Sequence, residues 1–134
     1  MNNNFVINVS VIICHRDEFL FIKRSLTESI FPGYWGIPGG KVEPFDESLE
    51  KAALRECYEE IGVKIQAPLK IVSHNIVRKG DLAVLYIVMM TELATKVECF
   101  PGVEVEKVQW MAKSDIQQLK KITPKTAEII MEYC

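Results

Sequence analysis

The feature that constrains this chain most is the stretch between Asp46 and Gly62, which contains no proline or glycine and predicts a helix. Three glutamates, Glu56, Glu59 and Glu60, crowd near its end. At about 100° per residue, their side chains fall within an arc of about 100° on one face. Like charges at such spacing destabilise a helix by roughly 0.2 to 0.5 kcal/mol per pair. The fold must therefore place these carboxylates in water or beside a cation.

The predicted helix should be covered on two sides. Asp46 is expected to cap its start, and Gly62 to end it. Apolar residues flank the helix: Leu49, Ala52 and Ala53 beside the glutamates, and Leu54, Tyr58 and Ile61 almost opposite. Carboxylates held at a protein cleft repel each other more strongly unless a cation intervenes, and Mg²⁺ or Mn²⁺ suits such oxygen-rich sites. Glu56 and Glu60, four residues apart, are the best-placed pair, and a solvated helix surface is the alternative.

Most of the remaining chain has the alternating apolar pattern of strands. The predicted strands lie at residues 5–14, 18–24, 69–77, 82–91 and 103–111. Tight turns are expected at Arg16 and Asp17, between the first two strands, and at Gly80 and Asp81, between the next two. Residues 25–40 lose the periodicity and gather prolines and glycines, which predicts a shaped loop.

Two short helices are expected near the end of the chain. Ser114 can cap a helix over residues 115–121, and Thr123 with Pro124 can open another over residues 124–133. Strands joined as hairpins and accompanied by a few helices favour a mixed sheet covered by helices. We therefore predict an α/β or α+β fold in a single domain, residues 1–134.

The composition argues against several classes of protein. A net charge of −2 over 134 residues gives no electrostatic footprint for long nucleic acid, although a local basic pocket could hold a small anion. The longest apolar run, residues 82–90, is far too short for a membrane span of about 20 residues. Four scattered cysteines, Cys14, Cys57, Cys99 and Cys134, fit reduced thiols. Because the start of the chain lacks an export signal, we expect a cytoplasmic protein without a membrane partner.

The helix and the loop before it resemble the sequence box of the Nudix hydrolases, the MutT-like family. That box reads Gly, five residues, Glu, seven residues, and then Arg-Glu-apolar-any-Glu-Glu-any-Gly-apolar. Here Glu47, seven residues and the run from Arg55 to Val63 match the box in register. The first spacer differs, because six residues, KVEPFD, separate Gly40 from Glu47. We expect a bulge near Phe45 and Asp46, which leaves the role of Glu47 open.

The resemblance implies an α/β/α sandwich around a mixed β-sheet. It also implies hydrolysis of a diphosphate linked to another moiety, often a nucleoside, with Mg²⁺ or Mn²⁺ as the cofactor. By position in the box, the metal ligands would be Glu56, Glu59, Glu60 and the carbonyl oxygen of Gly39. Arg55 would orient the glutamates, and it would join Glu56 and Glu59 as a catalytic residue.

The general base varies within the family. Glu104, which precedes the last predicted strand, is the candidate for a catalytic base, with Glu98 and Glu106 as rivals. The alternative for all three is a solvated strand edge.

Several residues are candidates for substrate binding. Arg24 could meet a phosphate, and Tyr34 or Trp35 could stack on a base. The backbone at Gly40 and Lys41 could approach the ligand closely. The alternatives are a surface charge for Arg24 and core packing for Trp35.

Three functions remain open at this stage. The first is a metal-dependent pyrophosphohydrolase that acts on a small nucleotide-type diphosphate, which the acidic set favours. The second is a module of the same fold that senses a nucleotide without cleaving it. The third is an isomerase of isoprenoid diphosphates, which would need further catalytic residues. The resemblance also leaves a homodimer open.

Overall fold

The core of the fold is one mixed sheet of seven strands. The computed structural model describes residues 4–123 and 125–133. Its strands are β1 (Phe5–His15), β2 (Glu18–Arg24), β3 (Trp35–Gly36), β4 (Gly39–Lys41), β5 (Lys70–Lys79), β6 (Leu82–Glu92) and β7 (Val105–Ala112). The strand order is β3-β2-β1-β6-β5, with β4 also paired to β1 and β7 to β2. Among the strands of the described residues, β1 and β6 pair in parallel and the other pairs are antiparallel.

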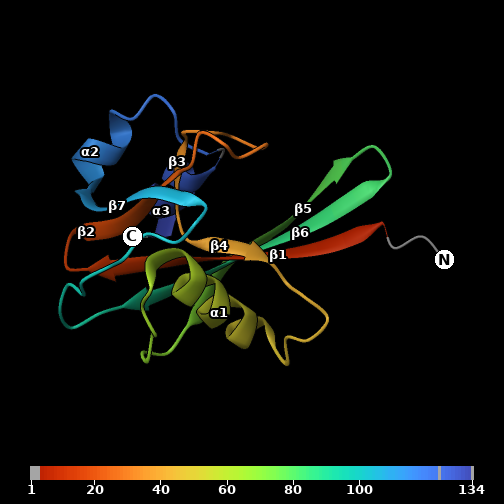
Figure 1. Cartoon of the computed structure of the whole chain (residues 1–134), viewed down its shortest axis with the longest axis horizontal. Coiled ribbons are helices and arrows are strands. Elements are labelled where there is room, and N and C mark those ends of the chain that lie inside the picture. The colour runs from red at the N-terminus through yellow and green to blue at the C-terminus, as the bar shows by residue number, and fades with distance from the viewer. Residues whose placement is uncertain (1–3, 124, 134) are drawn as a thin grey trace.

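Helices cover both faces of this sheet, so the predicted α/β/α layering is confirmed. The helices are α1 (Leu49–Ile61), α2 (Lys113–Gln117) and α3 (Thr126–Tyr133). Helix α1 packs against β4 and β1 with a cluster that includes Ala53, Cys57 and Ile61, whereas Ile116 of α2 and Ile130 of α3 pack in a second cluster. Figure 1 shows α1 on one side of the sheet and α2 on the other, with the β5–β6 hairpin extending past the helices. None of the described helices is long and apolar enough to cross a lipid bilayer.

The acidic helix ends where the sequence predicts but begins two residues later. Gly62 takes the left-handed conformation with φ of 69°, and its N–H donates to the Tyr58 carbonyl. Ser48, not Asp46, is the N-cap, because its hydroxyl accepts the Lys51 N–H at 3.0 Å. The prediction for Asp46 is wrong because its carboxylate is engaged elsewhere.

The second apolar stripe predicted on α1 is only partly buried. Ile61 is buried and Leu54 is half-buried, but Tyr58 is 52% exposed. The Lys64 ammonium lies 5.6 Å from the centre of the Tyr58 ring. Helix α1 is therefore covered mainly on the side that faces β4 and β1.

The predicted start of α2 is also wrong. Strand β7 runs directly into α2, so Ala112 is the N-cap and Ser114 lies inside the helix. The Asp115 carboxylate accepts the Ala112 N–H at 3.2 Å. Helix α3 begins at Thr126, and the predicted contribution of Pro124 lies outside the described residues.

We predict that Gly62→Ala destabilises the protein more than Gly80→Ala. Both glycines have positive φ, a conformation that costs an L-residue about 1–2 kcal/mol. An added Cβ at Gly62 would lie 3.3 Å from Phe100 Cβ, whereas at Gly80 it would meet nothing within 4 Å. Urea unfolding of both variants measures the difference. Equal losses would contradict the packing of Phe100 against the end of α1.

Candidate active site

The C-terminal half of α1 places two carboxylates against strand β4. We call Arg55, Glu56, Glu59 and Glu60 the acidic site. Glu60 is only 8% exposed, and its Oε1 accepts the Gly39 N–H at 2.6 Å. Burial raises the pKa of Glu60 to about 8, with the Gly39 hydrogen bond opposing and the Glu56 charge adding to the rise. The site therefore contains a carboxylate that water does not stabilise.

Glu56 lies directly against Gly40. A Cβ built at Gly40 would sit 2.4 Å from Glu56 Cδ, so only glycine leaves room for this carboxylate. Burial also raises the pKa of Glu56, while the Arg55 guanidinium acts in the opposite direction. The double glycine of β4 thus serves both glutamates. The Gly39 amide binds Glu60, and the missing side chain of Gly40 leaves room for Glu56.

Arg55 connects the acidic site to the preceding loop. Its Nη1 donates to Glu56 Oε1 at 3.0 Å and to Glu59 Oε1 at 3.1 Å. Its Nε and Nη2 donate to the two carboxylate oxygens of Asp46 at 2.9 and 2.8 Å, and Nη2 also reaches the Lys41 carbonyl. The hydrogen bond to Asp46 is the main cause that raises the pKa of Arg55 above its usual value. Arg55 thus contacts two of the glutamates that it was expected to orient, and its partnership with Asp46 was missed.

The predicted metal ligands lie close together but do not enclose a common point. Among the described residues, no three His, Cys, Asp or Glu side chains form a group that could hold a metal ion. Arg55 and the Gly39 amide instead balance Glu56, Glu59 and Glu60. The donor chemistry nevertheless fits Mg²⁺ or Mn²⁺, because hard carboxylate oxygens with raised pKa values gain most from a nearby divalent cation.

Glu104 lies near the acidic site, as its charge contributes to raising the pKa of both Glu56 and Glu60. Its backbone carbonyl accepts the Ser25 N–H at 3.0 Å, which ties the loop before β7 to the end of β2. The rival Glu106 is bound to Lys23 at 3.6 Å. Glu104 thus acts electrostatically on Glu56 and Glu60, whereas Glu106 pairs with Lys23.

Arg24, the last residue of β2, acts electrostatically on Glu60 and binds the loop that follows β2. Its charge lowers the pKa of Glu60, although burial outweighs it. Its Nε donates to the Ile30 carbonyl at 2.9 Å, and its Nη2 donates to Glu28 at 3.1 Å. The Tyr34 ring lies 5.2 Å from the Phe31 ring. Arg24, the last residue of β2, therefore anchors the loop that carries the Phe31–Tyr34 pair.

Trp35 points away from this loop. It pairs with Lys23, packs against the core cluster that contains Ile116 and Ile130, and so lies on the face opposite α1. The structure supports core packing for Trp35 rather than base stacking. Lys41, by contrast, is exposed at the end of β4.

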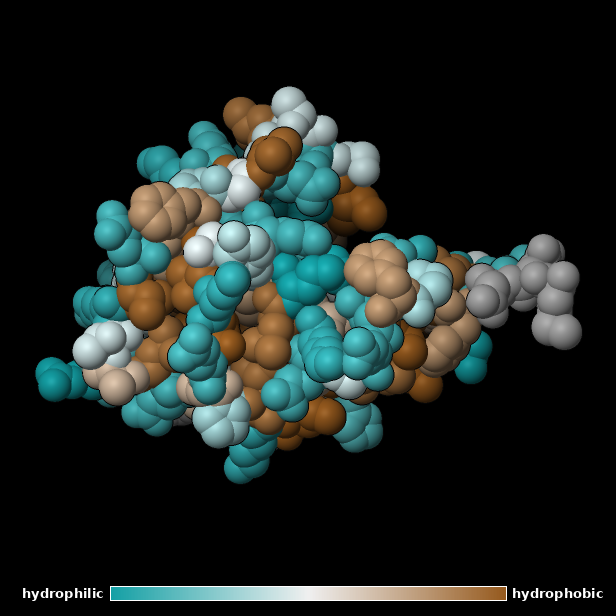
Figure 2. Space-filling model, turned by 60° about the horizontal axis from the view of Figure 1, so that its bottom comes forward, coloured by the Kyte–Doolittle hydropathy of each residue, from teal (hydrophilic) through white to brown (hydrophobic). Residues whose placement is uncertain are grey.

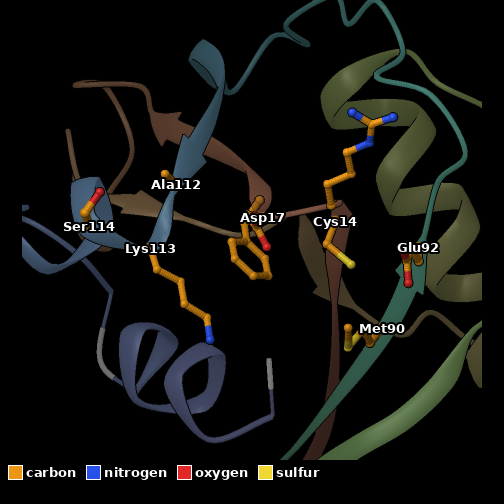
Figure 3. A pocket seen from close by; sticks show the side chains of 9 residues that line it. Cys14, Asp17, Met90, Glu92, Ala112, Lys113 and Ser114 are labelled. Atoms are coloured by element: carbon orange, nitrogen blue, oxygen red, sulfur yellow. The ribbon is translucent and has the colours of Figure 1, made fainter.

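Two surface features complete the picture. Figure 2, which brings the α1 side forward, shows hydrophilic residues near the middle of the face and hydrophobic surface around them. A hollow of about 520 Å³ lies elsewhere, between the β1–β2 turn, the end of β6 and the start of α2. Cys14, Asp17, Met90, Glu92 and Lys113 are among its lining residues (Figure 3). No residue of the acidic site lines this hollow.

We predict that the metal-free protein loses stability as the pH rises from about 4.5 to about 8. Across that range the folded protein keeps the Glu60 proton that the unfolded chain releases, so rising pH favours unfolding. Glu60→Gln, which keeps an acceptor for the Gly39 N–H, should remove most of this fall, a few kcal/mol at about 1.4 kcal/mol per pKa unit. Urea unfolding at several pH values checks this, with Glu50→Gln on the same helix as the control. An unchanged fall in Glu60→Gln would show that Glu60 is not the group responsible.

Comparison with known proteins agrees with this geometry. The family model described as the NUDIX domain matches residues 4–133. An mRNA decapping complex subunit 2 from Schizosaccharomyces pombe is 34% identical over 95 residues, which are 69% of this chain and 12% of that protein. An 8-oxo-dGTP diphosphatase from Proteus vulgaris is 41% identical over 54 residues, 40% of this chain and 47% of that protein. The chain thus spans less than half the length of these two relatives.

The fold has a counterpart among solved structures. The crystal structure of a MutT protein from Methanosarcina mazei superposes with a TM-score of 0.82 over 98% of this chain and 94% of that one. The two sequences are 24% identical. This similarity concerns the fold, and it matches the mixed sheet and helices described above.

Proposed function

This chain belongs to the NUDIX domain family, and we propose that it is an enzyme that hydrolyses a diphosphate linkage in a nucleotide-type substrate. We further propose that it acts in the cytoplasm as a single domain and uses Mg²⁺ or Mn²⁺. The Proteus vulgaris relative is an 8-oxo-dGTP diphosphatase, which supports this substrate class.

The observation that carries the proposal is the desolvated pair Glu56 and Glu60 beside the double glycine of β4. Burial raises the pKa of both groups, and neighbouring carboxylates add to the rise, Glu59 for Glu56 and Glu56 for Glu60, so each gains from a cation. A diphosphate is itself anionic and binds such a site only when positive charge lies between the two. The pair therefore favours a metal-dependent reaction on a phosphoric anhydride.

The residues of the acidic site would divide the work. Glu56, Glu60 and Glu59, with the Gly39 carbonyl, would hold the metal, which supplies charge neutralisation of the diphosphate and a more acidic water. Arg55 orients Glu56 and Glu59 through Nη1. Glu104, which is exposed, would accept a proton from the attacking water.

The loop after β2 would bind the rest of the substrate. Arg24 supplies the positive charge closest in sequence to this loop and acts electrostatically on Glu60, which suits it to an anionic phosphate. The Phe31 and Tyr34 rings offer an aromatic surface for a base, and Phe31 is 37% exposed. The backbone of Gly40 and Lys41, which pairs with Val9 and Asn8 of β1, would approach the substrate beside Glu56.

We predict that Glu56→Gln, Glu59→Gln and Glu60→Gln each reduce phosphate-anhydride hydrolysis, with Glu56→Gln losing at least about 100-fold. Loss of a group that supports a metal ligand typically reduces activity about 10- to 100-fold, and loss of the ligand itself should reduce activity at least as much. The assay measures the nucleotide products formed from nucleoside triphosphates, ADP-ribose and dinucleoside polyphosphates with Mg²⁺. Glu50→Gln, exposed on the same helix, is the matched control and should keep full activity.

Equal activity in all five proteins would refute the proposed site. Tight nucleotide binding by calorimetry without metal, together with no turnover, would favour the sensing module instead. Mass analysis of the products separates a hydrolysed diphosphate from an isomerised one.

We also predict that Phe31→Ala raises the KM for a nucleotide about tenfold with little change in kcat. Stacking on an aromatic ring is worth about 1–3 kcal/mol per base, and an interaction made equally in ground and transition states changes KM alone. Leu26→Ala, in the same loop and 72% exposed, is the control. Steady-state kinetics on the best substrate would contradict the base-binding role if both variants matched the wild type.

A further inference from the structure

We propose that Asp46, and not the box residue Glu47, is the acid that positions Arg55 and thereby sets how strongly the acidic site binds a divalent cation. The part about Arg55 stands on the geometry alone, whereas the part about the cation rests on the proposed function. Asp46 takes this role in place of Glu47 because one extra residue separates Gly40 from Glu47.

Asp46 holds Arg55 in a closed and shielded arrangement. Its two oxygens accept Arg55 Nε and Nη2 at 2.9 and 2.8 Å, which is a bidentate pair, and its side chain is only 4% exposed. The Glu43 N–H donates to Asp46 Oδ2 at 2.8 Å, and the Asp46 N–H donates to the Glu43 carbonyl. The Phe45 ring lies 5.2 Å from Arg55 Cζ and covers the guanidinium. The expected irregularity near Phe45 and Asp46 is this turn.

Glu47 has none of these contacts. Its side chain is 76% exposed and pairs with Lys51 at 2.8 Å, one turn along α1. Such exposed pairs contribute little to stability. Counted from Gly40, Asp46 is the residue that follows a five-residue spacer, the spacing that the family box gives to its first acid. The surplus residue is therefore Glu47, which lies beside the helix cap Ser48.

The position of Arg55 matters because its guanidinium donates to carboxylate oxygens of Glu56 and Glu59, which are proposed metal ligands. Asp46 accepts hydrogen bonds from Nε and Nη2. Nη1 is therefore the group that contacts Glu56 and Glu59. Without Asp46 the planar guanidinium could turn and form a bidentate pair with one of these glutamates. It would then compete with a cation for the same carboxylates. Asp46 keeps Arg55 as a support for Glu56 and Glu59 rather than a competitor.

The test compares Asp46→Asn, which keeps the size of the side chain, with Glu47→Gln, which makes the same charge change one residue away. Mn²⁺ binding is measured from the electron paramagnetic resonance signal of the free ion. We expect Asp46→Asn to weaken Mn²⁺ binding about 10- to 100-fold, the usual cost of losing a group that supports metal ligands. Glu47→Gln should bind Mn²⁺ like the wild type.

A second measurement needs no metal. The Arg55 Nε–H resonance of the metal-free protein, observed by ¹⁵N NMR, should be protected from solvent exchange in the wild type and in Glu47→Gln. It should lose that protection in Asp46→Asn. Urea unfolding of each variant confirms that it is folded, and Asp46→Glu, which keeps the charge, provides a further variant if Asp46→Asn fails to fold.

The outcomes separate the two proposals. Loss of Arg55 protection in Glu47→Gln, or its retention in Asp46→Asn, would overturn the positioning role of Asp46. Unchanged Mn²⁺ binding in folded Asp46→Asn would overturn the effect on the cation. Absence of Mn²⁺ binding and of hydrolysis in the wild type would refute the proposed function, while the resonance of Arg55 would still decide which acid holds it.

Discussion

The contact between the double glycine of β4 and the acidic end of α1 is the constraint on which the rest of the site depends. Glu56 can reach its position because Gly40 has no side chain, and Glu60 can be buried because Gly39 offers an amide. Taking two carboxylates out of water is costly, and one hydrogen bond and one guanidinium repay only part of that cost. The folded protein therefore attracts positive charge at this site, and the proposed reaction would use that attraction to bind a metal ion.

The parts of the structure that local sequence determines were predictable. Gly62 ends α1 because only a residue that tolerates positive φ fits there, and the two hairpins follow from the turns at Arg16 and Gly80. The seven-strand order and the parallel pairing of β1 with β6 were not predictable from periodicity. They depend on contacts between residues far apart in the chain.

The errors have physical causes of the same kind. Asp46 has the side chain of a helix cap, but a bidentate bond to Arg55 outweighs a single bond to a backbone amide. Ser114 loses its capping position because β7 continues to Ala112. Trp35, for which core packing was the stated alternative, lies on the face opposite α1 because it pairs with Lys23 and side chains alternate along a strand. In each case the residue type indicated what the side chain can do, but the sequence did not reveal which partner it contacts.

The parallel pairing of β1 with β6 also bears on how the protein folds. Phe5 lies opposite Ala83 and Cys14 opposite Glu92, so the whole segment that carries β4 and α1 is the loop that this pairing closes. Closing so long a loop is slow, because its entropy is lost before the long-range contacts compensate. The glutamates and glycines lie inside this loop, and in a small single domain the charge-crowded surface and the core form in one cooperative transition.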